Sequence, residues 1–202
     1  MPTPALAATR LDDWLQQLSA PVPDPGGGAA AGIVIATGAA LVAMAAGYAP
    51  AEAAAEIAAA ATRVRGDALA AAEHDGRMSG RLVAAFRRPI DDPERREVLR
   101  AATVAAADAG ADLVALAASL DGPLLWLERF GEERLAPDVA VAARMLACGI
   151  RSTAVNIRGN TTSAAAAGVD ALTLERLRDA CDRATQAAAD LDAVAERVTA
   201  AL

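Results

Sequence analysis

Alanine makes up more than a quarter of this 202-residue chain, and that abundance restricts the fold more than any other feature. Alanine is the best helix former, because its side chain loses no rotamer entropy in a helix, and it gives a pleated sheet little to pack. The chain shows no strand-like alternation and no repeat of fixed period. We therefore predict an all-α fold: an antiparallel up-and-down helical bundle, packed by alanine and glycine.

Length and charge narrow the class further. The 202 residues fit a single domain over residues 1–202, and an apolar fraction of 54% can bury a sizeable core. All 19 basic residues are arginine, which excludes a catalytic lysine, and the net charge of −7 argues against a nucleic-acid partner. We recognise no secretory leader, so a cytoplasmic location is expected.

The two cysteines, Cys148 and Cys181, fit neither a disulfide framework nor a metal site. Each lies in an apolar helical stretch, so we expect both thiols to be buried and no metal to be bound. Residues 29–49 carry no charge and are long enough to span a membrane. They consist mainly of alanine and glycine, and a helix that is apolar all round is typical of a bundle core. We therefore expect a buried central helix and no membrane contact.

Spacing of apolar residues at three and four positions places the helices. Asp92 is expected to cap the helix that begins at Pro93. Residues 159–168, polar at first and then alanine-rich, are expected to form a linker before the last helix. The expected helices have more apolar faces than one small core can bury, which favours a homodimer. The expected helices cover about residues 10–18, 29–49, 51–74, 78–87, 93–120, 124–130, 136–156 and 174–202.

The most specific local feature is a glycine triplet, Gly26, Gly27 and Gly28, which follows Pro23-Asp24-Pro25 and leads straight into the uncharged helix. Successive glycines cost backbone entropy on folding, so they need a reason. One reason is close approach of a ligand to the free N–H groups of a helix N-terminus. The other is a tight turn packed against a neighbouring helix. The triplet alone favours neither.

Four segments carry a resemblance to a known family: residues 25–28 with 38–45, Asp75 with residues 83–89, residues 137–143, and residues 155–157. They cover nearly the whole chain, and the first and third are the more specific. Taken in this order, they resemble the cyclodeaminase/cyclohydrolase family of folate one-carbon enzymes. That family includes the cyclodeaminase part of formiminotransferase-cyclodeaminase and free-standing methenyltetrahydrofolate cyclohydrolases.

This resemblance implies an all-helical homodimer that takes a tetrahydrofolate derivative as its substrate, with no separate cofactor. Members of the family open the methenyl ring with water, or close a formimino group with loss of ammonia. The methenyl carbon belongs to a cationic amidinium, so a carboxylate can stabilise its charge or act as base on the attacking water. The resemblance implies Asp138 and Asp75 as catalytic residues, and Asp138 is the first choice. The residues that it implies for substrate binding are Gly26, Gly27, Gly28, Asn156, Arg87 and Arg88.

Each candidate also has a purely structural interpretation. Asp138 and Asn156 can be helix caps, Asp75 can end a helix, and the pair Arg87 and Arg88 can form a solvated face. The chain also matches the family's polar residues less well than it matches the residues that determine the fold. Two further hypotheses therefore stay open: the same fold acting on the ring of another small molecule, or a non-catalytic helical binding protein. The departures from the family pattern are Ala29, Gly47, Ser79, Ile90 and Ser152.

Overall fold

The computed structural model describes residues 6–49 and 52–202, and these residues contain helices and no strand. The all-α prediction is therefore confirmed. In chain order the elements are η1 (Leu6–Ala8), α1 (Leu11–Leu18), α2 (Gly27–Tyr48), α3 (Glu52–Arg87), α4 (Arg95–Ala118), α5 (Asp121–Phe130), η2 (Glu133–Leu135), α6 (Ala136–Ala167) and α7 (Ala171–Ala200).

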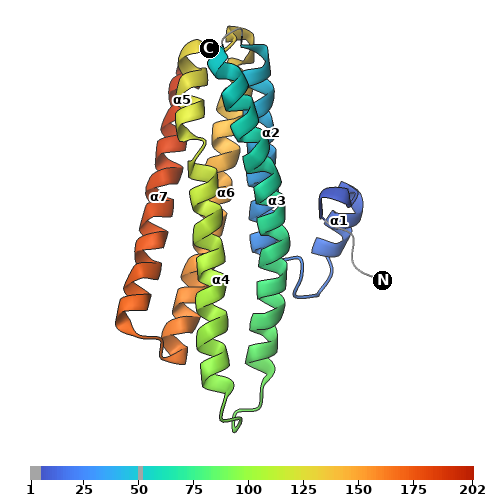
Figure 1. The fold of residues 1–202 in the computed structure, drawn as a ribbon, viewed down its shortest axis with the longest axis vertical. Helices are drawn as coiled ribbons and strands as arrows, with labels where there is room; N and C mark the ends of the chain where they lie inside the picture. Colours follow the sequence, from blue (N-terminus) through green and yellow to red (C-terminus); the bar gives the residue numbers. More distant parts are fainter. Residues whose placement is uncertain (1–5, 50–51) are drawn as a thin grey trace.

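The long helices run up and down along one axis (Figure 1). Helix α2 packs between α3 and α6, α4 packs against α3 and α6, and α7 lies along α6. Short α5 continues upward from the end of α4, and α1 stands beside the bundle. Helix α2 is shorter than its two neighbours, so its N-terminus lies part of the way along α3 and α6. That placement creates the candidate site.

Glycine and alanine let the helices approach closely, as the composition predicts. A Cβ on Gly38 would lie 2.9 Å from Cγ of Leu146, and one on Gly110 would lie 2.7 Å from Cγ1 of Ile157. Each glycine therefore receives a large side chain from the neighbouring helix, at the density of a close-packed interior. The largest fully buried side chains include Ile35, Leu120, Leu124, Leu146, Ile150, Ile157, Leu177 and Leu191.

The uncharged helix α2 is mostly covered by α3 and α6, while Met44 and Tyr48 stay exposed. By length and composition alone, α2 and the stretch from α4 through α5 could each cross a membrane. More than half of the α2 window is buried inside the protein. The packing therefore agrees with the expected core helix.

Two predicted breaks are wrong, because the helices continue through them. Helix α3 passes through Gly76 to Arg87, and α6 runs past Asn156 to Ala167. Hydroxyl groups in the expected linker bond back to carbonyls one turn earlier, for example Thr161 to the Ile157 oxygen at 2.8 Å. Helix α6 ends instead at Gly168, whose φ of 79° is left-handed.

Two local expectations are also wrong. Cys181 is buried, but Cys148 is exposed, because it lies on an outward face of α6. Asp92 precedes α4 by three residues and does not cap it. Its carboxylate accepts a hydrogen bond from the Glu94 amide at 2.9 Å and pairs with Arg88, so it closes the turn between α3 and α4.

Candidate functional site

The glycine triplet forms the N-terminus of α2. Gly26 is the N-cap residue in an extended conformation, and Gly27 and Gly28 begin the first turn. No side chain caps this end, and the first intrahelical bond is donated by Ala30 to the Gly26 oxygen. The N–H groups before Ala30 therefore have no helical acceptor, and the positive end of the helix dipole lies with them.

Asp75 on α3 places its carboxyl group against Gly28. A Cβ on Gly28 would overlap the carbon and both oxygens of that carboxyl group, so only glycine permits this approach. Burial raises the pKa of Asp75, and the negative charge of Asp24 raises it further. A hydrogen bond from the Ala29 backbone and the nearby His74 act in the opposite direction. Asp75 is thus a partly buried acid at a helix N-terminus.

Asp24, four residues before Gly28, makes a similar contact with Gly76, the residue after Asp75. The Asp24 carboxylate lies against Gly76, where a Cβ would overlap it. Two carboxylates, Asp24 from the loop before α2 and Asp75 from α3, are therefore held close to the same helix end. Their electrostatic coupling appears in the raised pKa of Asp75. Such a pair suits a cationic ligand.

Helix α6 contributes Asn156. Its Oδ1 and Nδ2 lie 3.6 and 3.8 Å from the position of a Cβ on Gly27. The side chain is half-buried, and its amide has no hydrogen-bond partner among the residues that the structure describes. Because α6 continues for eleven residues beyond it, Asn156 is not a helix cap. The structure thus brings together Gly27, Gly28, Asp75 and Asn156.

Asp138 lies elsewhere. It is in the first turn of α6, 18 residues before Asn156, which is about 27 Å along a helix that rises 1.5 Å per residue. Leu135 is the N-cap residue of α6, and no side chain caps this end. Asp138 therefore makes no capping bond, and a single chain does not bring it to the glycine triplet.

Arg87 and Arg88 also lie away from the triplet. Arg87 ends α3, twelve residues after Asp75 and about 18 Å along the helix. Arg88 pairs with Asp92 at 2.7 Å and with Glu94 at 2.9 Å. Its guanidinium is thus engaged in the turn between α3 and α4, while Arg87 is exposed.

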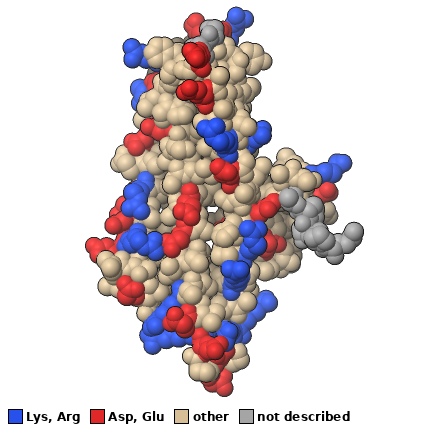
Figure 2. Space-filling model, in the orientation of Figure 1, with Lys and Arg blue, Asp and Glu red and all other residues tan. Residues whose placement is uncertain are grey.

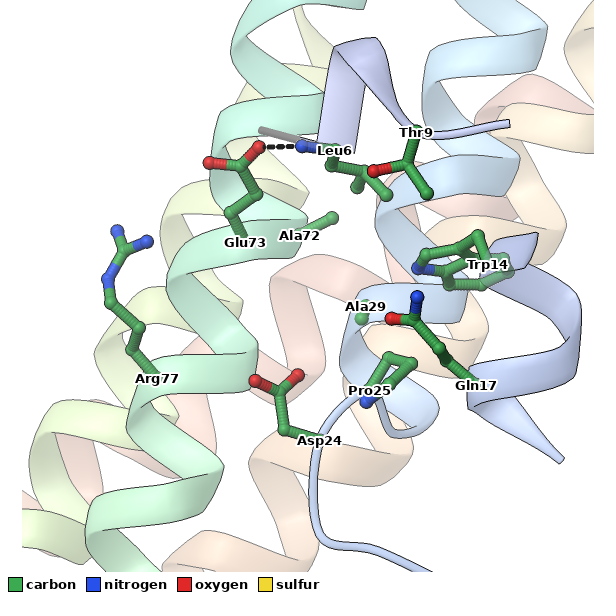
Figure 3. Close-up of a pocket in the computed structure, with 10 residues that line it drawn as sticks. All are labelled: Leu6, Thr9, Trp14, Gln17, Asp24, Pro25, Ala29, Ala72, Glu73 and Arg77. Atoms are coloured by element: carbon green, nitrogen blue, oxygen red, sulfur yellow. Dashed lines mark hydrogen bonds between the residues drawn. The ribbon is translucent and has the colours of Figure 1, made fainter. Parts of the chain in front are cut away.

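An open cavity of about 470 Å³ adjoins the triplet on the α1 side (Figure 3). The Glu73 carboxylate accepts the Leu6 backbone N–H, which holds η1 over the cavity. None of the residues that line this cavity was predicted as a site residue from the sequence, although Asp24 lies in the segment Pro23-Asp24-Pro25 directly before the glycine triplet. The lining residues are Leu6, Thr9, Trp14, Gln17, Asp24, Pro25, Ala29, Ala72, Glu73 and Arg77.

A second acidic group lies in the first turn of α5, where burial and the charge of Asp190 raise the pKa of Asp121 and Arg197 lowers it. Figure 2 shows acidic and basic side chains mixed over the visible face. Within residues 6–49 and 52–202, no three His, Cys, Asp or Glu side chains are grouped so as to hold a metal ion.

The fold and the site define an all-helical protein with an acidic centre at the uncapped N-terminus of an interior helix. A family model described as formiminotransferase-cyclodeaminase matches residues 10–193. The chain belongs to this family.

A comparison with solved structures agrees with this family assignment. A formiminotetrahydrofolate cyclodeaminase from Thermotoga maritima superposes with a TM-score of 0.83 over 96% of each chain, at 20% sequence identity. At this identity the likeness establishes the fold. A search of curated protein sequences finds no match.

Proposed function

We propose that this protein is a cytoplasmic enzyme that acts on a C–N bond in the ring of a tetrahydrofolate derivative. The reaction is that of a methenyltetrahydrofolate cyclohydrolase or of a formiminotetrahydrofolate cyclodeaminase. Membership of the family supports the substrate class. The observation that carries the proposal is the Asp75 carboxyl group, held against Gly28 at the uncapped N-terminus of α2.

The arrangement suits both the positive charge of the amidinium and the negative charge that develops on the added oxygen. In the cyclohydrolase reaction, water adds to the amidinium carbon, and the ring C–N bond to that carbon then breaks. Asp75 takes one proton of the attacking water and returns it to the departing nitrogen, while the second proton of that water leaves to solvent as the formyl C=O forms. The free N–H groups at Gly27 and Gly28 stabilise the negative charge on the added oxygen. In the cyclodeaminase reaction, a neighbouring nitrogen of the substrate attacks the formimino carbon, and the same acid protonates the amino group, which then departs as ammonia.

A raised pKa fits this role for Asp75. A general acid–base group works best when its pKa lies near the working pH, and an ordinary aspartate is too acidic. Burial and the charge of Asp24 both move the pKa of Asp75 upward. Asn156, with its amide unpartnered among the described residues, can orient the substrate by donating or accepting a hydrogen bond.

A second candidate is the same fold acting on the ring of another small molecule. The observation in its favour is Ser79, one turn after Asp75 on α3 and half-buried, where the family resemblance expects an aromatic residue. A small side chain leaves room for a ligand of different shape. Turnover of a folate substrate decides between the two candidates.

We also propose a homodimer through the outer face of α2 and α6. An apolar hollow of about 520 Å³ lies there, lined by Val34, Val141, Met145 and Leu202 among others. Val141 is 49% exposed and Leu202 is 70% exposed. Exposed apolar side chains grouped in this way are typical of protein–protein contacts.

The test is loss of the methenyl absorbance, corrected for spontaneous hydrolysis. We expect Asp75→Asn to lose about 10²-fold or more in rate, as for a lost general base. Asp67→Asn is the matched control, because Asp67 is exposed on the same helix two turns earlier. Release of ammonia from formiminotetrahydrofolate identifies a cyclodeaminase instead. No turnover of either substrate by the unmutated protein would refute the proposal.

A further inference from the structure

The N-terminal arm, residues 6–18, comprises η1 and α1 and is held to the bundle by a small contact. Of the described residues in η1 and α1, Trp14 alone is buried, with 6% of its surface exposed. Leu11 and Leu15 are 63% and 48% exposed, and residues 19–25, which join α1 to α2, form no helix. Figure 1 shows α1 standing beside the bundle. A segment with so few buried apolar contacts can open locally while the rest of the protein stays folded.

The indole of Trp14 packs where α2 and α3 meet. Its partners in the buried cluster are Ala29 on α2 and Ala72 on α3 (Figure 3). The two helices approach closely at this level, because a Cβ on Gly32 would lie 2.8 Å from the Cβ of Ala72. The indole therefore covers the outer edge of the contact between α2 and α3 and touches both helices at once.

Both alanines under the indole lead directly to Asp75. The Ala29 backbone donates a hydrogen bond to the Asp75 carboxyl group, and Gly28, the residue before Ala29, lies against the same group. Ala72 is three residues before Asp75 on α3, which is nearly one helical turn. A change in how Ala29 and Ala72 are covered therefore alters the access of water to Asp75.

We propose that the N-terminal arm is a movable lid over the contact between α2 and α3, and that Trp14 is a positioning residue that holds Ala29 against Asp75 while the arm is docked. With the arm docked, the indole keeps water away from Ala29 and Ala72. With the arm lifted, the cavity of about 470 Å³ beneath it opens fully, and water reaches the N-terminus of α2 and the Asp75 carboxyl group.

The proton affinity of Asp75 reports whether the arm is docked. Burial is the largest cause of the raised pKa of Asp75, so the entry of water lowers this pKa towards its ordinary value. Loss of the Ala29 hydrogen bond acts in the opposite direction, but burial is the larger influence. We therefore expect a lower pKa for Asp75 when the arm is lifted.

The charged groups around Asp75 stay in place when the arm moves, because they belong to α3 and to the segment before α2. On the arm itself, Arg10, Asp12 and Asp13 are exposed and do not line the cavity. Helix α6 presents the uncharged Asn156 to the glycine triplet. The charged groups that remain are Asp24, whose carboxylate lies against Gly76, and His74, Glu73 and Arg77 on α3.

This inference rests on the proposed function for one point, that Asp75 is the acid–base group of the reaction. A docked arm keeps Asp75 buried, and so keeps its pKa raised, while the chemistry takes place. A lifted arm lets substrate enter and product leave. Trp14 acts through Ala29 and is not a catalytic residue.

Hydrogen exchange followed by mass spectrometry measures how often the arm lifts. In the parent protein the amides of α1 should exchange faster than those in the middle of α6. In Trp14→Ala we expect α1 to exchange about tenfold faster still or more, while α6 keeps the parent rate. Trp14→Phe should keep most of the protection, because a phenyl ring can still pack on the two alanines. Leu15→Ala is the matched control, since Leu15 is an exposed neighbour on the same helix.

Carbon-13 NMR of labelled aspartate side chains measures the protonation of Asp75 directly, and Asp75→Asn identifies its resonance. In Trp14→Ala the titration midpoint of Asp75 should fall by about half a pH unit or more. Trp14→Phe should stay close to the parent midpoint, and Leu15→Ala should not change it. If Trp14 had only a structural role, Trp14→Ala would lower the Tm and leave the midpoint in place.

The outcomes separate this inference from the proposed reaction, because neither measurement needs turnover. Exchange of α1 that is no faster than that of α6 in the parent overturns the inference. Faster exchange in Trp14→Ala with an Asp75 midpoint that stays or rises also overturns it, and the reaction then stands or falls on its own assay. A lowered midpoint in a protein that turns over neither substrate upholds the arm and refutes the reaction. Leu18→Ala replaces Trp14→Ala if that variant does not fold, because Leu18 packs on the same cluster from the arm.

Discussion

Gly28→Ala should destabilise the protein, although alanine is the better helix former. Alanine gains up to about 1 kcal/mol over glycine in a helix. At Gly28, however, the new methyl group would overlap all three atoms of the Asp75 carboxyl group. Relieving such overpacking typically costs about 1–3 kcal/mol. After the helix gain is subtracted, we therefore expect a net loss of up to about 2 kcal/mol, or a Tm lower by up to several degrees.

Gly66→Ala supplies the matched control. Gly66 lies in α3, where a Cβ would meet nothing within 4 Å. Without a contact to relieve, this variant should gain about 0.5–1 kcal/mol. Denaturant unfolding of the two variants side by side measures the difference. If Gly28→Ala is stabilised as much as Gly66→Ala, the Asp75 carboxyl group does not occupy the space that we assign to it.

A double-mutant cycle tests whether the contact with Asp75 causes the destabilisation by Gly28→Ala. When Asp75→Ala removes the carboxyl group, Gly28→Ala should no longer destabilise, because the two side chains act through one contact. The coupling between the two substitutions should then be about 1–3 kcal/mol. Additive effects would refute the contact, even if Gly28→Ala alone is destabilising. Turnover by Gly28→Ala should also fall, since a displaced carboxyl group no longer meets the substrate.

Three further outcomes are expected. Because burial raises the pKa of Asp75 in the folded state, its proton is bound more tightly there than in the unfolded chain. The stability that this proton contributes is therefore lost as the pH rises from about 4 through the folded-state pKa. Over that pH range Asp75→Asn should become more stable relative to the parent protein. Urea unfolding at several pH values measures this difference. Asp138→Asn should keep turnover near the parent value, because α6 carries Asp138 to the other end of the bundle; a 10²-fold loss would place the reacting group there instead. Val141→Arg should convert the proposed dimer into a helical monomer in light scattering, and an unchanged dimer mass would locate the interface elsewhere.

Much of this protein could be predicted from its sequence, because the relevant signals are local. Alanine content and spacings of three and four residues indicate helices wherever they lie in the fold. The glycine triplet before the uncharged helix is likewise a local backbone property. The predicted breaks near Gly76 and Gly159 failed because a glycine costs a helix only about 1 kcal/mol, which packing readily offsets. The long neighbours α4 and α7 supply that packing.

The candidate site depended on the tertiary structure. Asp75, Asn156 and the glycine triplet were each identified in the sequence, but their meeting follows from how α3 and α6 are aligned against α2. A shift of one residue along a helix turns a side chain by about 100°, so no local pattern specifies which residue faces Gly28.

The same alignment separates Asp138 from this group and adds Asp24 to it. Asp138 matched the family closely, yet it lies about 27 Å along α6 from Asn156. Asp24 was not among the site residues predicted from the sequence, yet its carboxylate lies against Gly76. The sequence alone determined which residues are helical and which chemical groups are present. Only the packed bundle decided which groups meet, because that depends on contacts between segments far apart in the chain.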